Sequence, residues 1–199
     1  TCPATATNCA AAQDRTRSSA NNEFSMEHVD VDGDGSTFNS SSATLDMPAG
    51  STVRFAGLYW GAQSTAAARD EVLFEAGAGQ GYQNVTASIL DTSGSLNYQG
   101  FADVTASVAA RGNDIYTVAN VQARQGRGRY AGWSLVVVYE NPNEPWRNLT
   151  VFDGYQRVAR NAPVDITVSG FIAPPTGPVN ANIGIIAYEG DNRYSGDFA

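Results

Sequence analysis

The sequence predicts an all-β protein: a β-sandwich, with the jelly roll as the favoured topology and one or two short helices. Many short runs rich in Val, Ile, Tyr, Phe and Trp recur along the chain, and Gly, Pro, Asn and Asp lie between them. Only 16% of residues are charged, and Ser, Thr, Asn and 20 Gly supply most of the polarity. This composition is typical of a β-rich extracellular protein.

The stretch from Tyr130 to Val158 carries the strongest strand signal. Trp133, Leu135 and Val137 fall on one face at a period of two, and the alternate residues between them include Val136 and Val138. A strand that is apolar on both faces is typical of the interior of a sheet. The strands expected are 23–31, 51–60, 71–76, 83–90, 115–121, 130–139, 148–156, 164–168 and 183–188, and the helices 65–69 and 101–111.

Two segments are expected along the 199 residues: a polar N-terminal segment, 1–22, and a single β-sandwich domain, 23–199. The first segment contains both cysteines, Cys2 and Cys9. A close pair of cysteines in an acidic chain predicts a disulfide that closes a small loop, which favours an oxidising, extracellular location. The alternative, a zinc site, is weaker because the single histidine, His28, cannot complete four ligands.

The net charge of −8 makes nucleic acid and anionic membrane surfaces improbable partners. No apolar run approaches the length of a membrane-spanning helix, so membrane insertion is not expected. All 12 basic residues are arginine, which rules out Schiff-base and P-loop lysine chemistry. The block 130–158 contains no acidic pair at a catalytic spacing, and no nucleophile elbow accompanies His28, so we expect a protein that is not an enzyme and has no catalytic residues.

Asp30, Asp32 and Asp34 alternate in the run DVDGDG, followed by Asn39. Alternating carboxylates before a glycine can converge on Ca²⁺, which takes six to eight oxygen ligands. The run departs from an EF-hand loop, since its twelfth position is Ser41 in place of Glu. An acidic β-turn without metal is the competing interpretation, because Asp and Gly are ordinary turn residues. Ca²⁺ is therefore the one cofactor that the sequence suggests.

Three exposed contact residues are candidates for binding a partner. Arg127 and Arg129 lie in a glycine-rich basic loop, which is also typical of a solvated hairpin tip. Trp146 lies in the proline-flanked turn NPNEPW and is the tryptophan least expected in the core. An exposed indole could stack on a sugar ring.

Several motifs carry a family resemblance: DVDGDGSTFNSSSA, VRFAGLYWGA, YQGFADVT, YAGWSLVVVYENP, WRNLTVFDGY and IAYEGD. In order and spacing they resemble a β-rich module near the N-termini of large secreted, adhesin-like bacterial proteins, especially in actinobacteria. The resemblance implies a cell-surface location and a β architecture, and it supplies no catalytic residues.

Together these observations predict a non-catalytic structural or adhesive module of a bacterial surface. Two alternatives stay open: a filament or surface-layer subunit that assembles by strand addition, and a carbohydrate-binding module. The expected partners are other copies of the chain, neighbouring surface domains, or a host or glycan ligand.

Overall fold

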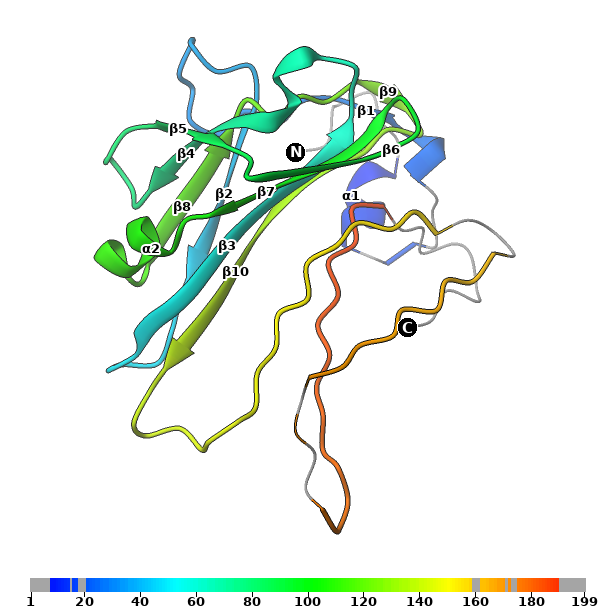
Figure 1. Ribbon diagram of the computed structural model, residues 1–199. Coiled ribbons are helices and arrows are strands. Elements are labelled where there is room, and N and C mark those ends of the chain that lie inside the picture. The colour runs from blue at the N-terminus through cyan, green and yellow to red at the C-terminus, as the bar shows by residue number, and fades with distance from the viewer. Residues whose placement is uncertain are drawn as a thin grey trace.

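The fold was analysed in a computed structural model, which describes residues 8–14, 16–17, 21–158, 162–170, 172 and 175–189. Two four-stranded antiparallel sheets face one another, and a small two-stranded sheet lies at one end (Figure 1). The all-β sandwich predicted from the sequence is confirmed. The strands are β1 (Ser25–Met26), β2 (Ser40–Leu45), β3 (Thr52–Gln63), β4 (Glu71–Ala76), β5 (Gln83–Thr86), β6 (Ile89–Ser93), β7 (Asn97–Asp103), β8 (Asp114–Ala119), β9 (Gly126–Arg127) and β10 (Ala131–Glu140).

The first sheet has the order β10-β3-β7-β6 and the second β2-β8-β4-β5; β1 pairs with β9. Only β4–β5 and β6–β7 join neighbours in sequence within a sheet, so the other connections cross between sheets. β10 and β2 are therefore edge strands, and they lie on the same side of the sandwich, where the Trp133 indole donates to Ser41 Oγ at 2.8 Å. This strand order was not available from the sequence.

Helices contribute little to the fold. The helical segments are α1 (Cys9–Gln13), η1 (Asn21–Glu23), η2 (Ala67–Asp70) and α2 (Thr105–Arg111). The helix expected over 101–111 begins only at Thr105, because Phe101 and Ala102 belong to β7. The Asp103 carboxylate accepts the amide of Thr105 at 2.8 Å at this boundary. Among the described residues, no helix is long and apolar enough to cross a membrane.

The core lies between the facing sheets and is built by the even-numbered residues of β3. Ala56, Leu58 and Trp60 are all fully buried. Trp60 packs against Gly100 of β7, where a Cβ atom would lie 2.5 Å from the indole ring. The rest of the cluster comes from β3, β4, β7, β8, α2 and the residues next to them: Ala62, Val72, Phe74, Tyr98, Ala102, Val104, Val108, Tyr116, Val118 and Val121.

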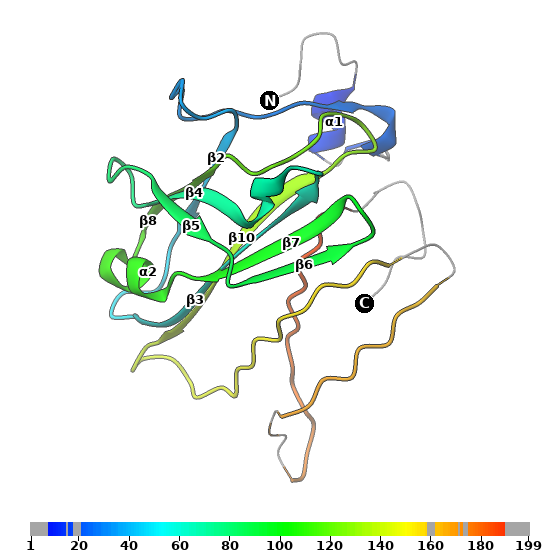
Figure 2. The same ribbon diagram turned by 45° about the horizontal axis from the view of Figure 1, so that its top comes forward.

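The chain after β10 differs from the sequence prediction. The strands expected at 148–156, 164–168 and 183–188 do not form: the described residues there run extended without regular sheet pairing (Figure 2). Alternating apolar residues favour a strand, but a strand forms only where a neighbouring edge supplies backbone partners. Among the described residues, thirteen of the nineteen exposed large hydrophobic side chains lie after residue 145.

Candidate functional site

The acidic loop is held together by its own hydrogen bonds. Asp30 accepts from the Ser40 hydroxyl at 2.8 Å, and the Asp34 carboxylate accepts the amide and hydroxyl of Ser36 at 2.9 and 2.8 Å. Asp32 accepts from the Thr37 hydroxyl at 3.0 Å and, over a short contact, from the Tyr82 hydroxyl. These are the bonds of an acidic turn.

The charge of Asp32 is strongly favoured. Burial acts to raise its pKa, but hydrogen bonds from Tyr82, the Asp34 amide, Thr37 and Ser40 outweigh it and lower the pKa to about 2. The contact has the opposite effect on Tyr82: burial and the neighbouring Asp32 carboxylate raise the pKa of its phenol.

Asn39 does not face the carboxylates. Its side-chain Nδ2 donates to the Val121 carbonyl at 2.8 Å, and its Oδ1 accepts from the Val121 backbone amide at 3.0 Å. These two bonds tie the loop to the chain that follows β8. The described part of the chain contains no group of three acidic, His or Cys residues placed to hold a metal ion. The Ca²⁺ site stays a prediction; the contacts show what a cation would have to displace.

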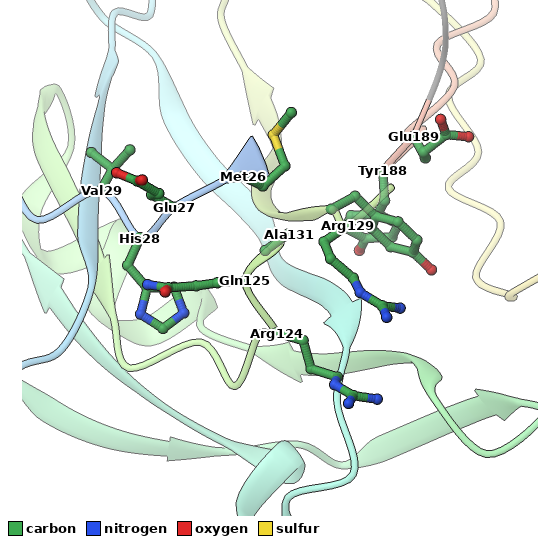
Figure 3. A pocket seen from close by; sticks show the side chains of 11 residues that line it. Met26, Glu27, His28, Val29, Arg124, Gln125, Arg129, Ala131, Tyr188 and Glu189 are labelled. Carbon is green, nitrogen blue, oxygen red and sulfur yellow. The ribbon is translucent and has the colours of Figure 1, made fainter. Parts of the chain in front are cut away.

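A cavity of about 360 Å³ lies between residues 26–29, which begin in β1, and the loop before β10, and Tyr188 and Glu189 complete its lining. Figure 3 shows His28 beside Gln125, and the guanidinium groups of Arg124 and Arg129 turned toward the same side. His28 Nε2 lies 3.1 Å from the Ala123 carbonyl, and Arg129 donates to Gln63 Oε1 at 2.9 Å. Both side chains therefore carry structural contacts.

The predicted contact residues do not form one site. Arg127 belongs to β9, near the start of β10, and Arg129 is tied to Gln63. Trp146 follows the far end of β10 and is 99% exposed. The ten residues of β10 separate the two places by about 33 Å of strand. Cys9 begins α1 and is half-buried, whereas Cys2 lies outside the described residues, so the disulfide remains a prediction.

Segments after β10 cover part of the outer face of the first sheet. The ring of Tyr188 lies over Gly61 and Gly132, which are cross-strand partners in β3 and β10. Its hydroxyl donates to Gln99 Oε1 at 3.1 Å, and the Gln99 amide donates to the Gly154 carbonyl at 3.3 Å. Burial raises the pKa of Tyr188, so the phenol stays neutral.

No described strand covers the side of the sandwich between β2 and β10, which we call the open side. A second cavity, of about 310 Å³, lies between these edge strands. Its apolar lining comes from both sheets and includes Leu45, Tyr116, Trp133 and Leu135. This site was not predicted from the sequence, because β2 (SSSATL) carries too few apolar residues to be recognised as a strand. The only signal that pointed here was the strongly apolar character of β10.

The fold defines an all-β sandwich protein, and in the part of the chain that the structure describes one side of the sandwich has no covering strand. A model of the family described as "Protein of unknown function (DUF3344)" matches residues 15–174, and the chain belongs to this family. Comparisons with curated proteins and with solved structures found no match.

Proposed function

We propose that this chain is a non-catalytic structural or adhesive module of an extracellular bacterial protein, and that it acts through its strand edges and apolar surfaces. The observation that carries the proposal is the open side of the sandwich, where an apolar edge strand and a cavity lie together. An exposed strand edge offers unpaired amide and carbonyl groups to an added strand. The motif resemblance to secreted, adhesin-like actinobacterial proteins supports the same role and location.

The location is tested on cells of an organism that encodes the protein. Antibodies against the purified chain should label intact cells, and protease added outside should remove the signal. A cytoplasmic protein serves as the control for cell integrity. Labelling that requires permeabilised cells would contradict the extracellular location.

Carbohydrate binding is a second candidate because of Trp146. Its indole is 99% exposed in a turn whose prolines restrict the backbone, so both ring faces are open to stacking. A glycan array with the wild-type chain and Trp146→Ala tests this role. Binding that Trp146→Ala abolishes supports it, while binding that is absent or unchanged in the variant excludes a Trp146 platform.

A further inference from the structure

In the first sheet, the core-facing side chains of the edge strand β10 are less buried than those of its neighbour β3. In β3, Ala56, Leu58 and Trp60 are fully buried. Their cross-strand partners in β10 are Val137, Leu135 and Trp133, which point to the same core and are only half-buried. Nothing in the described chain pairs with the outer edge of β10. At this edge, therefore, no described strand lies beside β10 to bury its core-facing side chains, and one added strand would do so.

The cavity between β2 and β10 is the space that such a strand would fill. It runs between the two sheets and is lined by Leu45 on one side and by Trp133 and Leu135 on the other. An added strand on β10 would place every second side chain into this cavity, and the residues between would face solvent. The occupant must therefore have apolar residues at a period of two.

Residues 164–168 have this pattern. Val164, Ile166 and Val168 are 37%, 70% and 42% exposed, and Asp165 and Thr167 alternate with them. No hydrogen bond between described residues involves this segment. Figure 1 and Figure 2 show residues 162–170 (orange) on the far side of 178–189 from the sheets.

The segments on either side are already attached to the sandwich. Tyr155 contacts the Tyr130 hydroxyl at 3.4 Å, and Tyr188 bonds to Gln99. Both anchors hold the chain on the outer face of the first sheet, whereas the cavity opens at the edge between the sheets. In one copy, residues 162–170 therefore lie beyond 178–189 and do not pair with β10.

We propose that residues 164–168 of one copy add as a strand to β10 of a second copy and place Val164, Ile166 and Val168 in the cavity between β2 and β10. Donor and acceptor lie on different surfaces, so the contact is head-to-tail and joins copies into an open chain. Main-chain hydrogen bonds supply affinity, and the three β-branched side chains supply register. This inference rests on the proposed structural role and names the partner of the open edge.

Sedimentation of the purified chain over a range of concentrations tests the proposal. The wild type should form a ladder of oligomers. Ile166→Asp should shift assembly to at least roughly tenfold higher concentration, because it removes a buried aliphatic side chain and places a charge in the cavity. The matched control is Ile183→Asp: Ile183 is 84% exposed but lies outside the donor segment, so assembly should persist.

A peptide with the sequence of residues 162–170 should block assembly of the wild type, and the same peptide with Ile166→Asp should not. A wild type that stays monomeric at every concentration would overturn the proposal. The proposal would also fail if Ile166→Asp and Ile183→Asp weakened assembly equally. In a monomeric wild type, a melting temperature lowered by Ile166→Asp would show that the segment pairs within its own chain. Surface labelling without assembly would leave the proposed function standing and reject only this inference.

Discussion

Trp133 and Trp60 are direct cross-strand partners, yet Trp60 is fully buried and Trp133 is only half-buried. The difference arises because β3 has a neighbour on both sides and β10 has one. The Trp133 indole compensates by donating to Ser41 Oγ at 2.8 Å, across the open side of the sandwich. This bond links the edges of the two sheets.

Replacing Ser41 by Ala should lower the free energy of unfolding by about 1 kcal/mol, the usual net contribution of one hydrogen bond. Urea denaturation of both proteins measures the difference. Ser134→Ala is the matched control, because Ser134 lies on β10 but faces away from the second sheet, and its substitution should change stability little. An equal loss in both variants would show that the Trp133–Ser41 bond does not stabilise the edge.

Gly100→Ala should destabilise the core. A Cβ atom at Gly100 would lie 2.5 Å from Cε2 of Trp60, and Trp60 cannot yield because it is fully buried and its indole donates to the Arg69 carbonyl at 3.0 Å. We expect a loss of about 1–3 kcal/mol, typical of overpacking. Gly35→Ala is the control, since a Cβ there meets no atom within 4 Å. Equal melting temperatures for the two variants would contradict this packing.

The sequence predicted the sandwich because its clearest strands alternate over a buried face. β4 (Glu71–Ala76) was predicted with its observed bounds, and β10 differs from its predicted range by one residue at each end. β2, β7 and β9 were missed, and the strand predicted at 83–90 is divided between β5 and the start of β6, which lie in different sheets. β2 is rich in Ser, and Gln99 and Gly100 interrupt the apolar pattern in β7. Gly100 is required by the Trp60 ring on a neighbouring strand, a contact that no local pattern contains.

The candidate site was less predictable, because it depends on which edges the topology leaves free. The apolar run of β10 predicted an interior strand with cover on both sides, and the structure places it at an edge. The acidic run of Asp30, Asp32 and Asp34 was recognised from spacing alone, but Tyr82, which supplies a strong contact to Asp32, is 50 residues away. Contacts of this range follow from the strand order.

The predicted disulfide between Cys2 and Cys9 can be tested directly. Under non-reducing conditions the intact mass should be lower than the reduced mass by two hydrogen atoms, and peptide mapping should join the two cysteines. The loop is short, so we expect reduction to lower stability by no more than about 2–3 kcal/mol. Alkylation of both thiols without prior reduction would contradict the pairing.

Acid should weaken the contact between Asp32 and Tyr82. The pKa of Asp32 is about 2 in the folded protein, below its ordinary value of 3.8, so the carboxylate stabilises the fold above the ordinary pKa. This contribution is lost as the pH falls from about 4 to about 2. Asp32→Asn should therefore be less stable than the wild type near neutral pH. The difference in the free energy of unfolding between the two proteins should become smaller in acid.

Tyr82→Phe is the companion variant, because it removes one hydrogen bond and leaves the carboxylate in place. The pKa of Asp32 should then rise toward its ordinary value of 3.8, so the loss of stability in acid should be smaller and should end at a higher pH than in the wild type. Urea denaturation across this pH range measures both variants. A gap between wild type and Asp32→Asn that does not change with pH would contradict the low pKa.

The last prediction concerns the ring of Tyr188 over the paired glycines of β3 and β10. A Cβ atom at Gly61 would lie 2.8 Å from Cζ of this ring and 2.9 Å from the Tyr98 carbonyl, whereas a Cβ at Gly132 would lie at an ordinary 3.8 Å from the ring. Gly61→Ala should displace Tyr188 and break its bond to Gln99, and Gly132→Ala should be tolerated.

Hydrogen exchange measures the result as faster exchange in residues 178–189 of the Gly61→Ala variant alone. Tyr188→Phe, which keeps the ring and loses only the bond to Gln99, should give a smaller increase. Equal exchange in the Gly61→Ala and Gly132→Ala variants would show that Tyr188 does not hold this segment on the sheet.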